Sequence, residues 1–221
     1  MFLYYITDSR QLASEYKDRA RLLLQCIQAA ASAGVDAIQL REKDLSARQL
    51  SDLANRAAVI IRAETAADKS KTKLLINSRV DVALACGADG VHLRSDDISA
   101  ADARAIFMQV GVTRPIIGVS SHTSKEVELA EGQGADFAVF GPVFGKVGLE
   151  SSALGIAALD RACRERAAAK PPMPVLALGG IDLSNARECL EAGAAGIAGI
   201  RLFQSGHVGE TVSRLRELEP R

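Results

Sequence analysis

The feature of this chain that most constrains its fold is a short phrase that occurs four times. Each copy contains a glycine, a two-residue turn and an apolar run that ends in an arginine or a glycine. The copies cover residues 33–41, 86–94, 133–141 and 192–201. A glycine at this point can end a helix in the left-handed conformation, and the apolar run is typical of a buried parallel strand. The phrase therefore indicates a helix that leads directly into a strand.

Four further apolar runs lie between the copies and alternate with amphipathic segments. The runs, at residues 3–6, 74–76, 116–119 and 175–178, are too short for buried helices and rich in Ile, Val and Leu. Amphipathic segments occupy residues 16–31, 47–62, 124–131, 154–168, 185–191 and 210–218, among others. Eight alternations in 221 residues give roughly 28 residues per unit. This spacing predicts an α/β fold, a (β/α)8 TIM barrel with a single domain over residues 1–221, and a doubly wound open sheet is the alternative.

Composition and charge narrow the class of protein. With 48% apolar residues and no Pro/Ser-rich linker, the chain can bury one large core. Its 27 basic and 27 acidic residues are spread evenly, which argues against a nucleic acid or an anionic membrane as partner. Four scattered cysteines favour neither disulfides nor a zinc site. Because no stretch resembles a signal peptide or a membrane span, we expect a cytoplasmic protein.

Polar residues follow the apolar runs, at the carboxyl ends of the strands, where barrels of this kind hold their active sites. Gln39, Arg41 and Lys43 alternate along the chain, so on an extended segment they point to one side. Two cations and an amide in one patch suit a multiply charged anion such as a diphosphate. An ion-pair cluster with Glu42 and Asp44 is the alternative, and the spacing does not decide between the two.

Glycines close the last two predicted strands. Gly179 and Gly180 follow the seventh run, and Gly199, Ile200 and Arg201 close the eighth. In α/β barrels these two loops, together with the start of a short helix, commonly bind a phosphate through backbone N–H groups. Arg201 adds a guanidinium to such a site. Glycine pairs also occur in plain turns, but the position of this pair predicts a phosphate site.

Seven segments, in chain order, resemble the thiamine phosphate synthase/TenI family. They are residues 5–8 (Tyr-Ile-Thr-Asp), 39–44 (Gln-Leu-Arg-Glu-Lys-Asp), 77–81 (Asn-Ser-Arg-Val-Asp), 87–93 (Gly-Ala-Asp-Gly-Val-His-Leu), 118–123 (Gly-Val-Ser-Ser-His-Thr), 141–144 (Gly-Pro-Val-Phe) and 178–181 (Leu-Gly-Gly-Ile). The resemblance covers essentially the whole chain. It implies a barrel whose synthase members join hydroxymethylpyrimidine diphosphate to a thiazole phosphate and release diphosphate.

The resemblance also implies roles for individual residues. Arg41 and Lys43 are expected to neutralise the diphosphate, and Asp97 to bind magnesium. The expected substrate contacts in the family segments are Gln39, Asn77 and Ser120, with Lys146 as the candidate for a family lysine. The leaving diphosphate requires positive charge rather than a nucleophilic side chain.

Three departures from the family pattern lie at the expected metal site and beside it. Ser78 stands where the family has its second magnesium carboxylate, and a neutral hydroxyl is a poor replacement for that ligand. Arg94 stands in place of a glycine, where it either crowds the metal or replaces part of its charge. Residues 145–150, which include Lys146, replace a Thr-x-Thr-Lys loop. We therefore expect magnesium to bind weakly or not at all.

Other activities stay open. TenI-type tautomerases aromatise a thiazole carboxylate phosphate by moving protons, which requires a phosphate site and a titratable group. His122 matches the histidine of the fifth strand and is the candidate proton carrier, with a purely structural hydrogen bond as the alternative role. A non-catalytic phosphate-ligand binder is the third hypothesis. All three imply a small phosphate as partner, and the sequence leaves homo-oligomer formation open.

Overall fold

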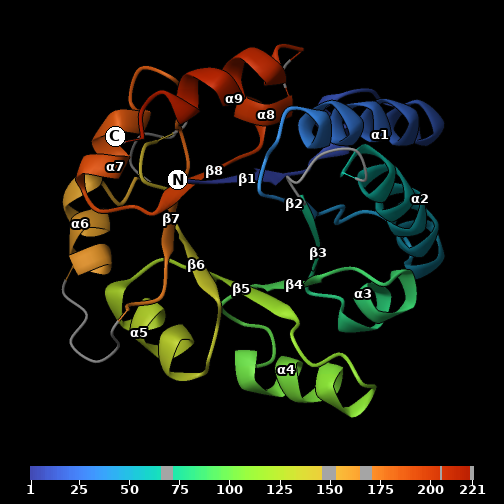
Figure 1. Ribbon diagram of the computed structural model, residues 1–221, viewed down its shortest axis with the longest axis horizontal. Helices are drawn as coiled ribbons and strands as arrows, with labels where there is room; N and C mark the ends of the chain where they lie inside the picture. The colour runs from blue at the N-terminus through green and yellow to red at the C-terminus, as the bar shows by residue number, and fades with distance from the viewer. Residues whose placement is uncertain (66–71, 146–152, 165–170, 205, 220–221) are drawn as a thin grey trace.

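Eight parallel strands form a closed barrel in sequence order, with helices around them (Figure 1). The computed structural model describes residues 1–65, 72–145, 153–164, 171–204 and 206–219. The strands are β1 (Phe2–Ile6), β2 (Ala37–Leu40), β3 (Lys73–Asn77), β4 (Gly90–Leu93), β5 (Ile116–Ser121), β6 (Phe137–Phe140), β7 (Val175–Leu178) and β8 (Gly196–Gly199). Because β1 pairs with β8, the barrel has no open edge. The predicted TIM barrel is confirmed, and the open sheet is wrong.

Helices cover the outer face of the strand ring (Figure 1). They are α1 (Tyr16–Ser32), α2 (Ala47–Thr65), α3 (Val80–Cys86), α4 (Ala100–Gln109), α5 (Ser124–Gly132), α6 (Ile156–Arg164), α7 (Ala186–Glu191), α8 (Arg201–Gln204) and α9 (Val208–Arg216), with a 3-10 turn η1 at Ser9–Gln11. The end of the predicted segment 154–168 lies outside the described residues. No helix in the described ranges is both long and apolar enough to span a lipid bilayer.

The repeated phrase ends helices as its glycine predicts. Gly34, Gly87, Gly134 and Gly193 follow α1, α3, α5 and α7, and their φ angles are 82°, 62°, 77° and 92°. An L-residue with a side chain rarely adopts this left-handed conformation. Each glycine therefore turns the chain from the outer helix layer back into the barrel.

Two copies of the phrase carry another glycine where the strand begins. A Cβ atom on Gly90 would lie 1.8 Å from the carbonyl oxygen of Ile116, and one on Gly196 would lie 1.9 Å from that of Phe2. These carbonyls belong to the neighbouring strands β5 and β1, which pair with β4 and β8. The two glycines thus permit a close approach of backbones near the amino ends of the strands.

Alternation along the strands divides the core in two. An inner cluster fills the barrel and contains Tyr4, Ile6, Ala37, Leu75, Phe137, Val139, Leu176 and Ala198. A larger cluster lies between the strands and the helices. Residues two positions further along the same strands also face inward, because side chains alternate with a period of two. Gln39 and Asn77 follow Ala37 and Leu75 in this way, which places them above the apolar layer at the carboxyl ends.

Replacement of Gly196 by alanine is expected to destabilise the protein by about 3 kcal/mol or more, because the added methyl group overlaps a backbone carbonyl that cannot rotate away. Gly132→Ala is the matched control: it lies in α5, nothing lies within 4 Å of the position of an added methyl group, and its φ is not left-handed. It should leave stability unchanged or raise it by up to about 1 kcal/mol. Urea denaturation of both variants measures the difference. Equal stabilities would refute the close approach.

Candidate active site

A buried chain of hydrogen bonds crosses the barrel below its mouth, the end at which the carboxyl ends of the strands lie. Gln39 Nε2 donates to the Tyr4 hydroxyl at 3.1 Å. The Tyr4 hydroxyl lies 3.2 Å from His92 Nδ1, and His92 Nε2 lies 2.9 Å from Ser120 Oγ. Since Tyr4 accepts from the amide, its own proton goes to Nδ1, and His92 donates from Nε2. Ser120 thus accepts this bond and keeps its hydroxyl proton for a ligand at the mouth.

Both titratable groups of this relay are neutral. Burial lowers the pKa of His92 to about 3, and the positive charge of Arg41 contributes in the same direction. Burial raises the pKa of Tyr4. The relay therefore orients Ser120 and does not supply a proton.

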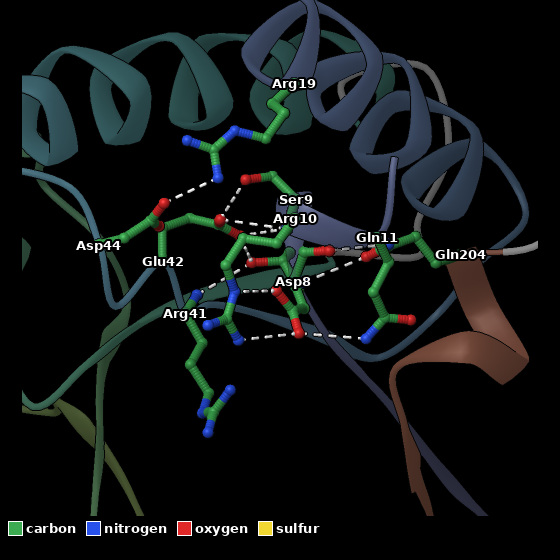
Figure 2. A network of polar contacts seen from close by, with 10 residues as sticks. Asp8, Ser9, Arg10, Gln11, Arg19, Arg41, Glu42, Asp44 and Gln204 are labelled. Carbon is green, nitrogen blue, oxygen red and sulfur yellow. Dashed lines mark hydrogen bonds and ion pairs between the residues drawn. The ribbon is translucent and has the colours of Figure 1, made fainter. Parts of the chain in front are cut away.

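Two cations without partners lie at the mouth. Neither the Arg41 guanidinium nor the Lys43 ammonium forms a hydrogen bond or ion pair with a described residue. Figure 2 shows the Arg41 side chain directed away from the carboxylates around Glu42. The pKa of Lys43 is lowered chiefly by the Arg41 charge, then by partial desolvation and by the charges of Arg94 and Arg10. Because the two charges repel each other, an anion between them would be stabilised.

The neighbouring acids have other partners, so the alternative ion-pair cluster is not formed. Asp44 accepts a hydrogen bond from Arg19 at 2.7 Å. Buried Glu42 accepts hydrogen bonds from the hydroxyls of Thr7, at 2.6 Å, and Ser9, at 2.5 Å. Its pKa is raised by burial, although these bonds lower it. Figure 2 shows this network of acids separated from the Arg41 guanidinium.

Thr7 joins this network to the cation site. Its Oγ donates to Glu42 and accepts a hydrogen bond from the backbone N–H of Arg41 at 2.9 Å. The buried acid thus fixes the chain at the point where β2 ends and the cations begin. Sequence reasoning missed this role, although Thr7 belongs to the Tyr-Ile-Thr-Asp segment. It also missed Tyr4, whose inward position follows from the period of two along β1.

Asp97, the predicted magnesium ligand, is already engaged by protein donors. Its Oδ2 accepts hydrogen bonds from Ser78 Oγ at 2.6 Å and from the backbone N–H of Arg94 at 2.8 Å. Its Oδ1 lies 3.5 Å from Arg94 Nε. Asn77 Nδ2 in turn donates to Ser78 Oγ at 2.9 Å. The predicted residues Asn77 and Asp97 are therefore brought together, with Ser78 between them.

This donor set does not fit a magnesium ion. Mg²⁺ requires oxygen ligands in near-octahedral geometry, whereas here a single carboxylate is bonded to two donors and faces a guanidinium. Across the described ranges, no group of three or more His, Cys, Asp or Glu side chains is placed to hold a metal. The assignment of Asp97 to a metal stays a prediction.

His122 presents one ring nitrogen to the protein and leaves the other available. Its Nδ1 lies 2.6 Å from the carbonyl oxygen of Gly141, which can only accept, so Nδ1 carries the proton. In the neutral ring Nε2 is then an acceptor. The side chain is exposed at the end of β5. This geometry is suitable for a proton carrier. It is equally compatible with the alternative role, a purely structural hydrogen bond.

The glycines after β7 are required by packing. Gly179 and Gly180 have φ angles of 103° and 62°. Their Cβ atoms would lie 2.5 Å from Pro142 Cβ and 2.7 Å from Phe144 Cβ, in the loop after β6. No described residue accepts a hydrogen bond from the backbone N–H of Gly180 or Ile200. These groups stay available to an anion.

Three predicted substrate contacts remain: Arg201, Gly199 and Lys146. Arg201 begins α8, is exposed, and pairs with no acid in the described ranges. Gly199 lies two residues before Arg201, and a Cβ atom there would lie 3.1 Å from Leu202 Cβ. Lys146 lies outside the described residues.

The chain is similar to known proteins along most of its length. The family model described as thiamine monophosphate synthase matches residues 3–203. A putative thiamine-phosphate synthase of Geobacter sulfurreducens is 42% identical over 198 residues, or 89% of this chain and 83% of that protein. A thiamine-phosphate synthase of Moorella thermoacetica is 36% identical over 204 residues, or 91% of this chain and 90% of that protein.

Two solved structures are similar to this chain in fold. A thiamine phosphate pyrophosphorylase from Pyrococcus furiosus aligns with a TM-score of 0.76 at 30% identity, over 98% of this chain and 94% of that one. A Rubisco-like protein from Rhodopseudomonas palustris aligns with a TM-score of 0.74 at 17% identity, over 100% of this chain and 65% of that one, and shares the fold alone.

The buried histidine generates a prediction about acid stability. Between pH 6.5 and about 3 an unfolded histidine binds a proton that folded His92 does not, so stability falls as the pH falls. This group should remove about 3 kcal/mol between pH 7 and pH 4. His92→Gln should flatten the pH dependence of the free energy of unfolding, and His207→Gln, at an exposed histidine, should not. Identical pH profiles for all three proteins would contradict a neutral buried His92.

Proposed function

Because the chain belongs to the thiamine monophosphate synthase family, we propose that it couples hydroxymethylpyrimidine diphosphate to a thiazole phosphate and releases diphosphate. In this reaction the bond between the pyrimidine methylene carbon and the diphosphate oxygen breaks. Its electron pair leaves with the diphosphate, and the thiazole nitrogen captures the pyrimidine-methyl cation. The protein must stabilise negative charge on the leaving group and hold the two rings together.

The observation that carries this proposal is the pair of cations without partners at the mouth. Arg41 and Lys43 would neutralise the diphosphate as its charge increases. Gln39 on β2 and Asn77 on β3 would orient the pyrimidine half. Ser120 would donate its hydroxyl proton to a substrate oxygen, because its Oγ already accepts a hydrogen bond from His92 Nε2.

The thiazole phosphate is assigned to the loops after β7 and β8. Support comes from the available backbone N–H groups of Gly180 and Ile200 and from the exposed guanidinium of Arg201. Gly179 and Gly199 would keep the two loops free of side chains at this point. Lys146 remains a proposed contact.

Magnesium is proposed to bind weakly or not at all, since the residues around Asp97 do not fit it. No step of the reaction is assigned to the metal. Relatives named thiamine-phosphate synthase support the transferase activity without bearing on this metal.

A TenI-type tautomerase is the second candidate, and the position of the His122 proton favours it. With Nδ1–H held by the Gly141 carbonyl, Nε2 is oriented as a base and can take a proton from a ligand and return it. This reaction uses the same phosphate site and needs no diphosphate site. A non-catalytic phosphate binder is the third candidate.

Lys43→Ala should lower coupling by about 10²-fold or more if the protein is a synthase, because a cation positioned on a leaving oxyanion is worth several kcal/mol. His122→Ala should then have the smaller effect. In a tautomerase the order is reversed. Lys17→Ala, at an exposed lysine of α1, is the matched control. The assay supplies both thiazole phosphate isomers, with and without the pyrimidine diphosphate, and detects products by mass and ultraviolet absorbance.

Small and equal effects of Lys43→Ala and His122→Ala would argue against both enzymes and favour the binder. Product in the assay without the pyrimidine diphosphate identifies the tautomerase. Product only when both substrates are present identifies the synthase.

Arg201→Ser should weaken thiazole phosphate binding by about 1.5–3 kcal/mol, the contribution of a hydrogen bond to a charged group. Calorimetric titration measures the change, and Arg187→Ser, at an exposed arginine of α7, is the control. Substitution of Gly180 is a poor test, because its left-handed φ and its contact with Phe144 make any side chain destabilising. Equal affinities of the Arg201→Ser and wild-type proteins would place the phosphate elsewhere.

A further inference from the structure

Arg94 lies directly after β4, two residues beyond inward-facing His92. The period of two along the strand therefore directs it to the same side, above the relay. Its Nη2 donates to Asp96 at 2.8 Å, and its Nε lies 3.5 Å from Asp97 Oδ1. Half of its side chain is exposed, at 50%. The guanidinium thus lies at the mouth and reaches solvent.

The charge of Arg94 acts on the two cations without partners. It is one of the positive charges that lower the pKa of Lys43, after the larger effect of Arg41 and the effect of desolvation. It also contributes to lowering the pKa of Arg41, for which burial is the main cause. Arg10 is close as well, but its Nε and Nη2 both donate to the Asp8 carboxylate. Three cations from the loops after β2 and β4 therefore lie near one another.

The acids around Arg94 hold it in this place. The Oδ2 of Asp97 is occupied by the Ser78 hydroxyl and the Arg94 backbone, and its Oδ1 faces the Arg94 side chain. This carboxylate therefore fixes a guanidinium rather than a metal. The bond to Asp96 is an ion pair at an acid with a side chain 70% exposed, and such pairs contribute little. An incoming anion can take that side of the guanidinium with little loss.

We propose that the Arg94 guanidinium takes the place of a divalent ion in the diphosphate site, so that this protein binds diphosphate with three side-chain cations and without metal. The proposal rests on the proposed function and names the source of positive charge at that same site. Arg94 is a binding residue in this description, together with Arg41 and Lys43. Ser78 and Asp97 are positioning residues, because they act through Arg94.

The test is calorimetric titration with inorganic diphosphate, once with EDTA and once with magnesium chloride. The wild-type protein should bind equally well in both. Arg94→Met keeps most of the side-chain length and removes the charge, so it should weaken binding in EDTA by about tenfold or more, as expected for a hydrogen bond between charged groups. Arg79→Met is the matched control, since Arg79 is similarly exposed and pairs with an acid, Asp81. Its affinity should not change.

A double variant tests whether a metal can replace the Arg94 guanidinium. Ser78→Asp with Arg94→Gly provides two carboxylates and removes the guanidinium, so diphosphate binding should become dependent on magnesium. Ser78 has a φ of 60°, and aspartate is among the residues that tolerate this left-handed conformation. The substitution at this position is therefore compatible with the backbone.

Three results would overturn the proposal: binding by the wild-type protein only with magnesium, no binding in either buffer, or no effect of Arg94→Met. The coupling assay distinguishes failure of this proposal from failure of the proposed synthase activity. Coupling that EDTA abolishes would refute the role of Arg94 and leave the synthase activity intact. Diphosphate binding without metal, but with no coupling, would refute the synthase activity alone.

Discussion

Each strand of the closed barrel turns every second side chain inward, and the candidate site depends on this alternation. Along the axis of the barrel the inward residues change from apolar to neutral polar to charged. Phe137 and Leu75 lie in the apolar layer, His92 belongs to the relay, and Arg41 and Arg94 follow at the mouth. Because side chains alternate along a strand, successive inward layers are two residues apart. A polar layer therefore separates the cations from the apolar core.

Hydroxyl groups keep the cations free for a ligand. Glu42 and Asp97, two acids of the loops after β2 and β4, are both bonded to serine or threonine hydroxyls. A hydroxyl stabilises a carboxylate without adding a positive charge, so these bonds do not use up Arg41 or Lys43. At Asp97 a backbone N–H adds a second bond and the Arg94 side chain is nearby. The site thus contains acidic and basic side chains next to one another, and these hydroxyl bonds leave Arg41 and Lys43 available to an anion.

The sequence predicted the barrel because its signals are local. A glycine in the left-handed conformation and a short apolar run can be recognised without knowledge of distant contacts, and Gly34 and Gly193 have that conformation. Helices α3 and α8 could not be recognised in the same way. They have 7 and 4 residues, which is too few turns to show a clear period of 3.6. Whether Lys43 pairs with an acid could not be predicted, because spacing does not show that Asp44 is bonded to Arg19 on another element.

The relay that ends at Ser120 has a consequence for the energetics of any reaction at the mouth. In water, dipoles must turn toward an oxygen as negative charge develops on it, and that solvent reorganisation is part of the activation barrier. The Ser120 dipole is already fixed by His92 and Tyr4 when the protein has folded. An oxyanion formed in front of it meets a donor that does not have to reorient. The free energy of that orientation is supplied in advance by the packing of the barrel interior.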